Sequence, residues 1–184
     1  LGIQKLGPHG LARHAAAAIP VKCHDILLRL AVFPLIRTEA LTGSPASSSA
    51  LLPSLTLVTG GARSGKSGFA EALALRSARP RRYIATAQAL DAEMADRIAR
   101  HRAQRGQDWQ TVEAPLDLCG ALAGAKAEEV VVVDCATLWL SNHLLAGNDL
   151  AAQSDCLLHA LTLCAAPVIM VSNEVGWGVV PENA

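Results

Sequence analysis

The sequence predicts an α/β fold in which a mainly parallel sheet is flanked by helices. Segments typical of strands alternate with segments typical of helices from residue 55 onward, and this alternation is the pattern of parallel sheets covered on both faces. The segment Glu129–Asp134 holds four valines in a row before it ends in an acid, as expected of a strand buried on both sides. The apolar run Leu55–Thr59, followed at once by glycines, places the first strand.

The same patterns predict the other elements. Strong helix formers and an apolar stripe at Phe69, Ala72 and Leu73 indicate a helix after the first strand. In chain order, we expect strands over 55–59, 82–86, 129–134 and 167–172, and helices over 66–78, 92–104, 137–146 and 150–165.

A change in composition near residue 54 divides the chain into two regions. Residues 1–54 contain an alanine run, scattered prolines and the small, serine-rich segment Thr42–Ala50, which is typical of a flexible linker. Apart from a weak helix over 24–32, we expect this region to be a poorly ordered extension or sequence outside the working protein. Residues 55–184 are expected to form one domain.

The bulk composition excludes several classes of protein. The 184 residues carry a formal net charge of zero, so no nucleic-acid partner is expected, and no apolar run is long enough to span a membrane. The five cysteines form neither CxxC pairs nor a zinc-like cluster with histidines, which favours free thiols in a reducing compartment. We therefore expect a cytoplasmic protein.

A phosphate-binding loop is predicted directly after the first strand. Residues 60–67 read GGARSGKS and fit the P-loop pattern G-x-x-x-x-G-K-[ST]. The glycines let the backbone curl so that its N–H groups point at phosphate oxygens, and the next helix adds its positive end. Because the motif lies between a predicted strand and a predicted helix, we expect the P-loop NTPase type (RecA-like) of fold. The expected nucleotide-binding residues are Gly60, Gly61, Ala62, Arg63, Ser64, Gly65, Lys66 and Ser67, with Lys66 on the β- and γ-phosphates and Ser67 on Mg²⁺.

Asp134 is the expected second ligand of Mg²⁺. It stands at the carboxyl end of a predicted buried strand, the edge at which open α/β sheets bind ligands. From there its carboxylate can hold Mg²⁺ through a water, as the acid of other P-loop enzymes does. The structural alternative is an N-cap of the helix predicted from Thr137, and the two roles are compatible.

A histidine among arginines is the second unusual feature. On the helix predicted over 92–104, Arg97, His101 and Arg105 fall at i, i+4 and i+8 and share one face, with Met94 and Ile98 alongside. Surrounding cations disfavour the imidazolium, so we expect a neutral ring whose nitrogen can attack phosphorus while guanidinium groups hold the phosphate oxygens. A basic, solvated helix with an incidental histidine is the alternative that the pattern alone leaves open.

Together these segments resemble the bifunctional adenosylcobinamide kinase / adenosylcobinamide-phosphate guanylyltransferase family. The resemblance rests on the glycine-rich loop and on five further segments: YIATA from Tyr83, DAEMADRIARHR from Asp91, WQTVEAP from Trp109, VDCATLWLSN from Val133 and NEVGWGVVPEN from Asn173. It covers about residues 55–183 and none of residues 1–54, so the first region would not belong to the family.

The resemblance implies two reactions in cobalamin biosynthesis. A nucleoside triphosphate, ATP or GTP, phosphorylates adenosylcobinamide, and GTP then transfers GMP through an enzyme histidine to adenosylcobinamide phosphate, giving adenosylcobinamide-GDP. It implies that His101 is the guanylylated histidine. Lys66 is expected to be catalytic as well, because its charge would stabilise the negative charge at phosphorus. The further positions implied in GTP binding are Ala85, Thr86, Ala87, Arg102, Ala103, Gln104, Arg105, Glu113 and Asp134.

The resemblance also bears on the chain ends and on assembly. Members of the family normally continue beyond the motif at 173–183 through another helix and a closing strand, so the domain over 55–184 is expected to be truncated. They are thought to form trimers, which implies a homo-oligomer. The glycines of that motif are expected either to admit a bulky corrinoid or to form a surface turn anchored by Trp177.

Three other functions remain compatible with the sequence. A simpler P-loop kinase of another small metabolite would form no covalent intermediate. A P-loop ATPase serving as an assembly module would hydrolyse nucleotide without a corrinoid acceptor. An inactive fragment would bind nucleotide and turn nothing over.

Overall fold

The computed structural model describes residues 52–89 and 91–174, and within them the sheet is entirely parallel. Its order is β1-β5-β4-β2-β3. The strands are β1 (Leu55–Gly60), β2 (Arg81–Ala85), β3 (Trp109–Glu113), β4 (Val130–Asp134) and β5 (Val168–Asn173). The predicted α/β class with a parallel sheet is confirmed, and the single strand β5 separates the strand that carries the glycine-rich loop from the strand that carries the acid.

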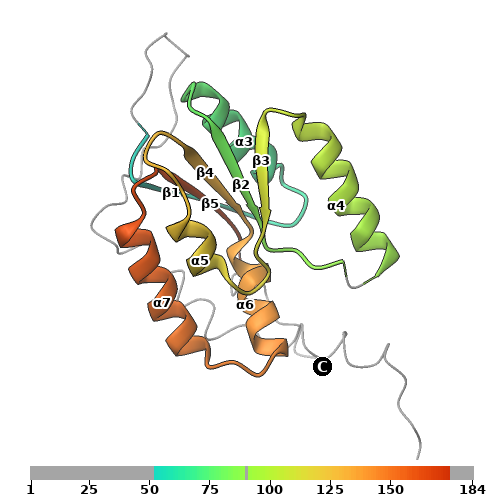
Figure 1. Cartoon of the computed structure of the whole chain (residues 1–184). Helices are drawn as coiled ribbons and strands as arrows, with labels where there is room; N and C mark the ends of the chain where they lie inside the picture. The colour runs from blue at the N-terminus through green and yellow to red at the C-terminus, as the bar shows by residue number, and fades with distance from the viewer. Residues whose placement is uncertain (1–51, 90, 175–184) are drawn as a thin grey trace, which may run out of the picture.

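Helices cover both faces of this sheet. They are α3 (Lys66–Arg76), α4 (Ala92–Arg105), α5 (Leu118–Ala123), α6 (Ala136–Leu145) and α7 (Leu150–Leu163). In Figure 1, α3 lies behind the sheet and α5 and α7 lie in front of it, while α4 stands beyond the edge strand β3. The described elements match the predicted ones to within about two residues at each end, which is the usual uncertainty of such boundaries.

Two elements were not predicted as such. β3 is an edge strand in which Trp109 is buried while Gln110 and Glu113 are exposed, so its sequence WQTVE lacks the apolar run that marks β4. α5 has six residues, too few for the 3.6-residue period to become visible. The expected weak helix over 24–32, the expected linker and Trp177 all lie outside the described residues.

The core has two parts, one on each face of the sheet. The part facing α5, α6 and α7 centres on the fully buried Trp139, and the part facing α3 contains Ala70 and Ala74. The predicted apolar stripe of α3 was wrong in detail, because Phe69 is 44 % exposed and Ala72 is also exposed. The small side chains of Ala70 and Ala74 face the sheet instead, and they let the helix approach the strands closely.

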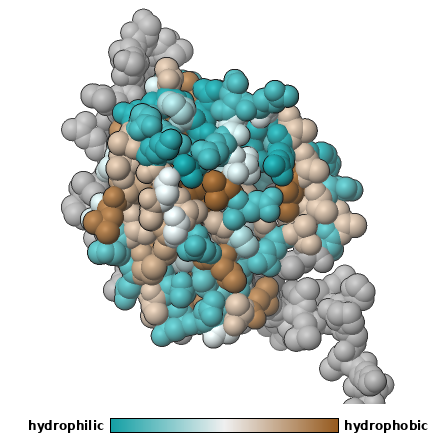
Figure 2. Space-filling view, in the orientation of Figure 1, coloured by the Kyte–Doolittle hydropathy of each residue, from teal (hydrophilic) through white to brown (hydrophobic). Residues whose placement is uncertain are grey.

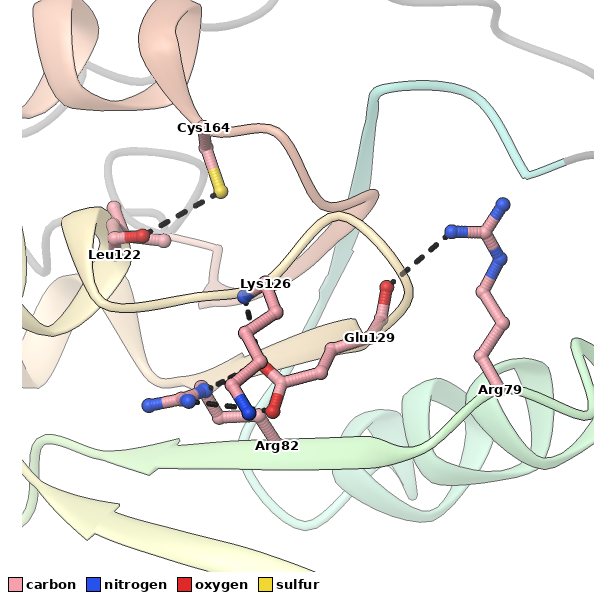
Figure 3. A network of polar contacts seen from close by, with 6 residues as sticks. All are labelled: Arg79, Arg82, Leu122, Lys126, Glu129 and Cys164. Carbon is pink, nitrogen blue, oxygen red and sulfur yellow. Dashed lines mark hydrogen bonds and ion pairs between the residues drawn. The ribbon is translucent and has the colours of Figure 1, made fainter.

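A buried ion pair ties β2 to the loop before β4 at the amino edge of the sheet. Arg82 Nε and Nη2 donate to the two carboxylate oxygens of Glu129 at 2.9 and 3.3 Å, and the backbone N–H of Lys126 also donates to Glu129 at 2.9 Å (Figure 3). Burial alone would raise the pKa of Glu129, but these hydrogen bonds outweigh it and lower that pKa. The carboxylate is therefore held charged in the interior.

The visible surface is of mixed polarity. In the view of Figure 2, strongly apolar residues form small separate patches among hydrophilic ones. The exposed large apolar side chains in the described residues include Leu145 and Leu163, which are 59 % and 69 % exposed. None of the helices described is both long enough and apolar enough to cross a membrane.

Candidate functional site

The predicted site residues gather at the carboxyl ends of the strands. In the register of the sheet, Ala85 pairs with Glu113 on one side and with Asp134 on the other, so three neighbouring strands end side by side. Gly60 pairs with Asn173 at the corresponding end of β1 and β5. Thr86 and Ala87 follow directly on β2. Ligands bind at this edge in open α/β sheets.

The glycine-rich loop leaves the same edge and turns into α3. Gly65 stands at the N-cap of α3 with φ 83°, a left-handed conformation that favours glycine. A Cβ placed on Gly60 would lie 2.8 Å from Ser64 Oγ and 3.3 Å from Lys66 Cδ, so any side chain there would have to displace both. Lys66 Nζ donates to Gly61 O at 2.6 Å, which places the ammonium group over the loop. The strand–loop–helix context predicted for the motif is confirmed.

Thr86 fastens the end of β2 to the end of β4. It is fully buried, and its hydroxyl donates to Cys135 O and accepts from Cys135 N, both at 2.8 Å. Asn142 on α6 then donates to the carbonyls of Thr86 and Pro115 at 2.8 and 2.9 Å. These bonds satisfy buried backbone groups and fix the loops that follow β2 and β3, the strands on one side of Asp134.

Asp134 uses its side chain toward the sheet and not as a helix cap. Tyr83 Oη donates to Asp134 Oδ2 at 2.5 Å. Helix α6 begins at Ala136, and its N-cap residue is Cys135, without a side-chain cap hydrogen bond. The alternative that made Asp134 the cap of this helix is therefore wrong, and the acid expected to hold Mg²⁺ lies at the sheet edge.

Helix α4 runs beside the edge strand β3 (Figure 1), and side chains from its second half reach the site. Asp91 caps its first turn by accepting from Met94 N at 2.7 Å, and Met94, Ile98 and His101 are half-buried. Arg102 Nη1 lies 3.8 Å from Glu113 Oε1 in an exposed pair. Of the site residues predicted on this helix, Ala103 is exposed, and the side chains of Arg97 and Gln104 lie outside the described part of the structure.

Arg105 is the exception on this helix, because its side chain is buried. It is 4 % exposed, and its Nη1 lies 4.0 Å from Glu71 Oε1 on α3. Its guanidinium carbon lies 3.4 Å from the centre of the Tyr83 ring, which is close enough for a strong cation–π contact. Helix α4 thus reaches both α3 and β2 through one side chain.

Asp134 is close enough to α3 for its charge to act on Glu71. Burial raises the pKa of Glu71, and the charge of Asp134 raises it further while Arg105 lowers it. Glu71 lies four residues after Ser67 on the same face of α3. Burial together with the charge of Asp134 raises the pKa of Tyr83 far above its ordinary value. The phenol therefore stays protonated and donates a hydrogen bond to Asp134.

The residues present fit a magnesium site that nucleotide completes. Within the described residues, no group of three or more His, Cys, Asp or Glu side chains could hold a metal unaided. Protein sites for Mg²⁺ commonly use one or two oxygen ligands together with substrate phosphates. Ser67 at the start of α3 and Asp134 at the end of β4 supply oxygen ligands of that kind.

Reasoning from the sequence missed Tyr83, Glu71 and Asn142 as parts of this site. A signal existed for Tyr83, because a tyrosine in a buried strand usually places its hydroxyl on a polar partner. That signal did not identify the partner, because the register that brings Asp134 next to Tyr83 is known only from the structure. Glu71 and Asn142 gave no comparable signal.

Comparisons with known proteins show the family to which the chain is similar. The family model described as cobinamide kinase / cobinamide phosphate guanyltransferase matches residues 56–184. A bifunctional adenosylcobalamin biosynthesis protein of Pseudomonas aeruginosa is 50 % identical over 128 residues, which are 68 % of this chain and 74 % of that protein. The proteins of the same description from Escherichia coli and Salmonella typhimurium are 42 % and 40 % identical over 145 residues, 70 % of this chain and 80 % of theirs.

Proposed function

Because the chain belongs to the cobinamide kinase / cobinamide phosphate guanyltransferase family, we propose that it phosphorylates adenosylcobinamide and then transfers GMP from GTP to the product. The observation that carries the proposal is the meeting, at one sheet edge, of the glycine-rich loop, Asp134 and the helix that bears His101. A P-loop kinase without a covalent step would not need that helix.

We assign the triphosphate to the loop over 60–67. Backbone N–H groups of the loop and the N-terminus of α3 attract phosphate oxygens. Lys66 exchanges its bond to Gly61 O for the β- and γ-phosphates. Mg²⁺, held by Ser67 and by Asp134 through water, would neutralise charge that develops on the phosphates.

The first reaction is a direct phosphoryl transfer. The hydroxyl oxygen of the corrinoid side chain attacks the γ-phosphorus, the bond between that phosphorus and the β,γ-bridging oxygen breaks, and the nucleoside diphosphate leaves. The hydroxyl proton is lost to solvent. Lys66 and the loop amides stabilise the negative charge on the transferred group.

The second reaction uses His101 as a nucleophile. A neutral imidazole nitrogen of His101 attacks the α-phosphorus of GTP, an N–P bond forms, and pyrophosphate leaves. A phosphate oxygen of the corrinoid then attacks the same phosphorus, the N–P bond breaks, and the imidazole is restored. Splitting one transfer into two displacements is the general advantage of covalent catalysis.

The nucleotide also needs contacts around the transferred GMP. We assign these to Ala85 and Ala87 around the end of β2, to Arg102, Ala103 and Gln104, and to Glu113, while the fully buried Thr86 holds the loop after β2 in place. Arg102 is exposed and free to meet phosphate oxygens once it leaves Glu113, whereas the burial of Arg105 favours a positioning role for that residue.

Covalent labelling tests the proposal directly. The full chain is incubated with GTP and Mg²⁺, and its intact mass is measured. We expect one added GMP, lost on acid treatment because a phosphoramidate is acid-labile. The variant H101A should not be labelled, whereas H159A, which removes an exposed histidine of α7, should be labelled like the wild type. Labelling of H101A at the wild-type level would refute the assignment.

The family resemblance supports two further proposals. We infer a homo-oligomer, with a trimer as the expected state, and a cytoplasmic location. Light scattering of the purified chain measures the first, and a monomeric mass would contradict it.

A further inference from the structure

A chain of four side chains connects helix α4 to the acid at the end of β4. Asp134 accepts a hydrogen bond from Tyr83, the ring of Tyr83 packs against the guanidinium of Arg105, and Arg105 pairs with Glu71. The four residues come from β4, β2, α4 and α3. Arg105 lies one helical turn after His101 on the same face of α4.

The contacts at Tyr83 are buried and directional. Tyr83 is 2 % exposed, and its 2.5 Å hydrogen bond to Asp134 Oδ2 is in the range of charge-assisted bonds to a carboxylate. Its ring is also packed edge-on against Trp109, with centroids 6.0 Å apart. The ring therefore has little freedom, and both the carboxylate and the guanidinium are held against a fixed surface.

We propose that Tyr83 is a positioning residue: its hydroxyl orients the Asp134 carboxylate for Mg²⁺, and its ring face, through Arg105, holds α4 in register with that carboxylate. The inference rests on the proposed function for the roles of Asp134 and His101. Its consequence is that metal binding at β4 and the placement of the nucleophile on α4 depend on one ring.

Metal binding gives the first test, because it needs no turnover. In the full-length variant Y83F the ring, its volume and its contact with Arg105 remain, and only the donor to Asp134 is lost. Removing a group that orients a metal ligand typically costs about 10- to 100-fold in metal affinity. We expect the Mg²⁺ concentration that half-saturates binding of a fluorescent GTP analogue, with a methylene bridge between its α- and β-phosphorus atoms so that no GMP can be transferred, to rise by about tenfold or more. A midpoint within about twofold of the wild type would overturn the proposal.

Replacement of Arg105 gives a second test, because a pure charge effect and the proposed positioning effect would change Mg²⁺ affinity in opposite directions. Loss of a nearby cation, acting through charge alone, would strengthen Mg²⁺ binding. If Arg105 acts by fixing the Tyr83 ring, R105Q should weaken Mg²⁺ binding, as Y83F does, and should also slow GMP labelling of His101. Tighter Mg²⁺ binding in R105Q would contradict the proposal.

A buried arginine on the same strand as Tyr83 supplies the control. R82Q breaks the pair with Glu129, which is as buried as that of Arg105 but lies at the amino edge of the sheet. It should lower thermal stability while leaving the Mg²⁺ midpoint unchanged. If the Mg²⁺ midpoint shifted equally in R82Q and R105Q, general destabilisation would explain both shifts, and the inference would be overturned. Because the analogue assay involves no transfer to His101, failure of the guanylyltransferase proposal would show up separately, as absent labelling of the wild type.

Discussion

Replacement of Gly60 by alanine should separate nucleotide binding from folding. The φ angle of Gly60 is not among the positive ones, so alanine meets no backbone strain there. Its Cβ, however, would lie 2.8 Å from Ser64 Oγ and 3.3 Å from both Cγ and Cδ of Lys66. Ser64 is exposed and can rotate, but the lysine stem must also move by a few tenths of an ångström.

The expected magnitudes differ for the two properties. Turning side chains away from their preferred rotamers costs about 0.5–1.5 kcal/mol, so we expect a loss of about 1 kcal/mol in the free energy of unfolding and a fall of roughly 4 °C in Tm. Displacing Lys66 from the phosphates removes a charged hydrogen bond, which contributes about 1.5–3 kcal/mol to the free energy of GTP binding. That corresponds to a loss of about 10- to 100-fold in GTP affinity.

Isothermal titration with GTP and thermal unfolding, on the same preparations, measure both quantities. The matched control is G68A, since a Cβ on Gly68 of α3 meets nothing within 4 Å and alanine is a better helix former by at most about 1 kcal/mol. G68A should keep the wild-type affinity with equal or higher stability. If folded G60A bound GTP within about twofold of the wild type, the assignment of the phosphates to the loop and to Lys66 would be refuted.

Further predictions concern stability and oxidation. Because the pKa of Glu129 is lowered in the folded state, its ion pair contributes fully above its ordinary pKa of 4.5 and is lost as the pH falls through the lowered value. E129Q should therefore lose several kcal/mol near pH 7, about 3–5 for a broken buried pair, and less at low pH; equal losses in chemical denaturation at both pH values would contradict this. Cys119 Sγ and Cys156 Sγ, on α5 and α7, lie 2.8 Å apart as free thiols, so dilute hydrogen peroxide should join them, with loss of two hydrogens and release of water. If peptide mapping found both cysteines still reduced after peroxide treatment of the folded protein, the predicted disulfide would be contradicted. Asp149 caps α7 by accepting hydrogen bonds from two backbone N–H groups. D149A should lower the free energy of unfolding by about 1 kcal/mol, measured by thermal unfolding, and an unchanged stability would show that the cap contributes nothing.

The sequence was most informative where structure is determined locally. Four valines before Asp134 specify a strand buried on both faces, and the glycine pattern specifies the turn into α3. In these segments, consecutive residues determine the burial pattern, the turn and the start of the helix. β3 is an edge strand without an apolar run, and α5 has six residues, too few to show the helical period, so neither was recognised.

The contacts between distant segments could not be predicted in this way. Tyr83 meets Arg105 and Asp134, which lie 22 and 51 residues further along the chain. Such pairs depend on strand order, and nothing in the sequence alone states that β4 lies between β2 and β5. The helical spacing of His101 and Arg105 was correctly predicted, but it did not reveal that Arg105 points into the protein.

The burial of Arg105 changes how the basic helix should be understood. A row of arginines beside a nucleophilic histidine suggests that all of them bind phosphate. Yet a guanidinium that is 4 % exposed and packed on a ring cannot meet phosphate without giving up those contacts. Arg102, which is 64 % exposed, can do so at little cost because exposed ion pairs contribute about 1 kcal/mol or less. We therefore propose different roles for the two arginines: Arg102 is available to the nucleotide, and Arg105 keeps the helix, and His101 with it, against the strand that ends beside the acid.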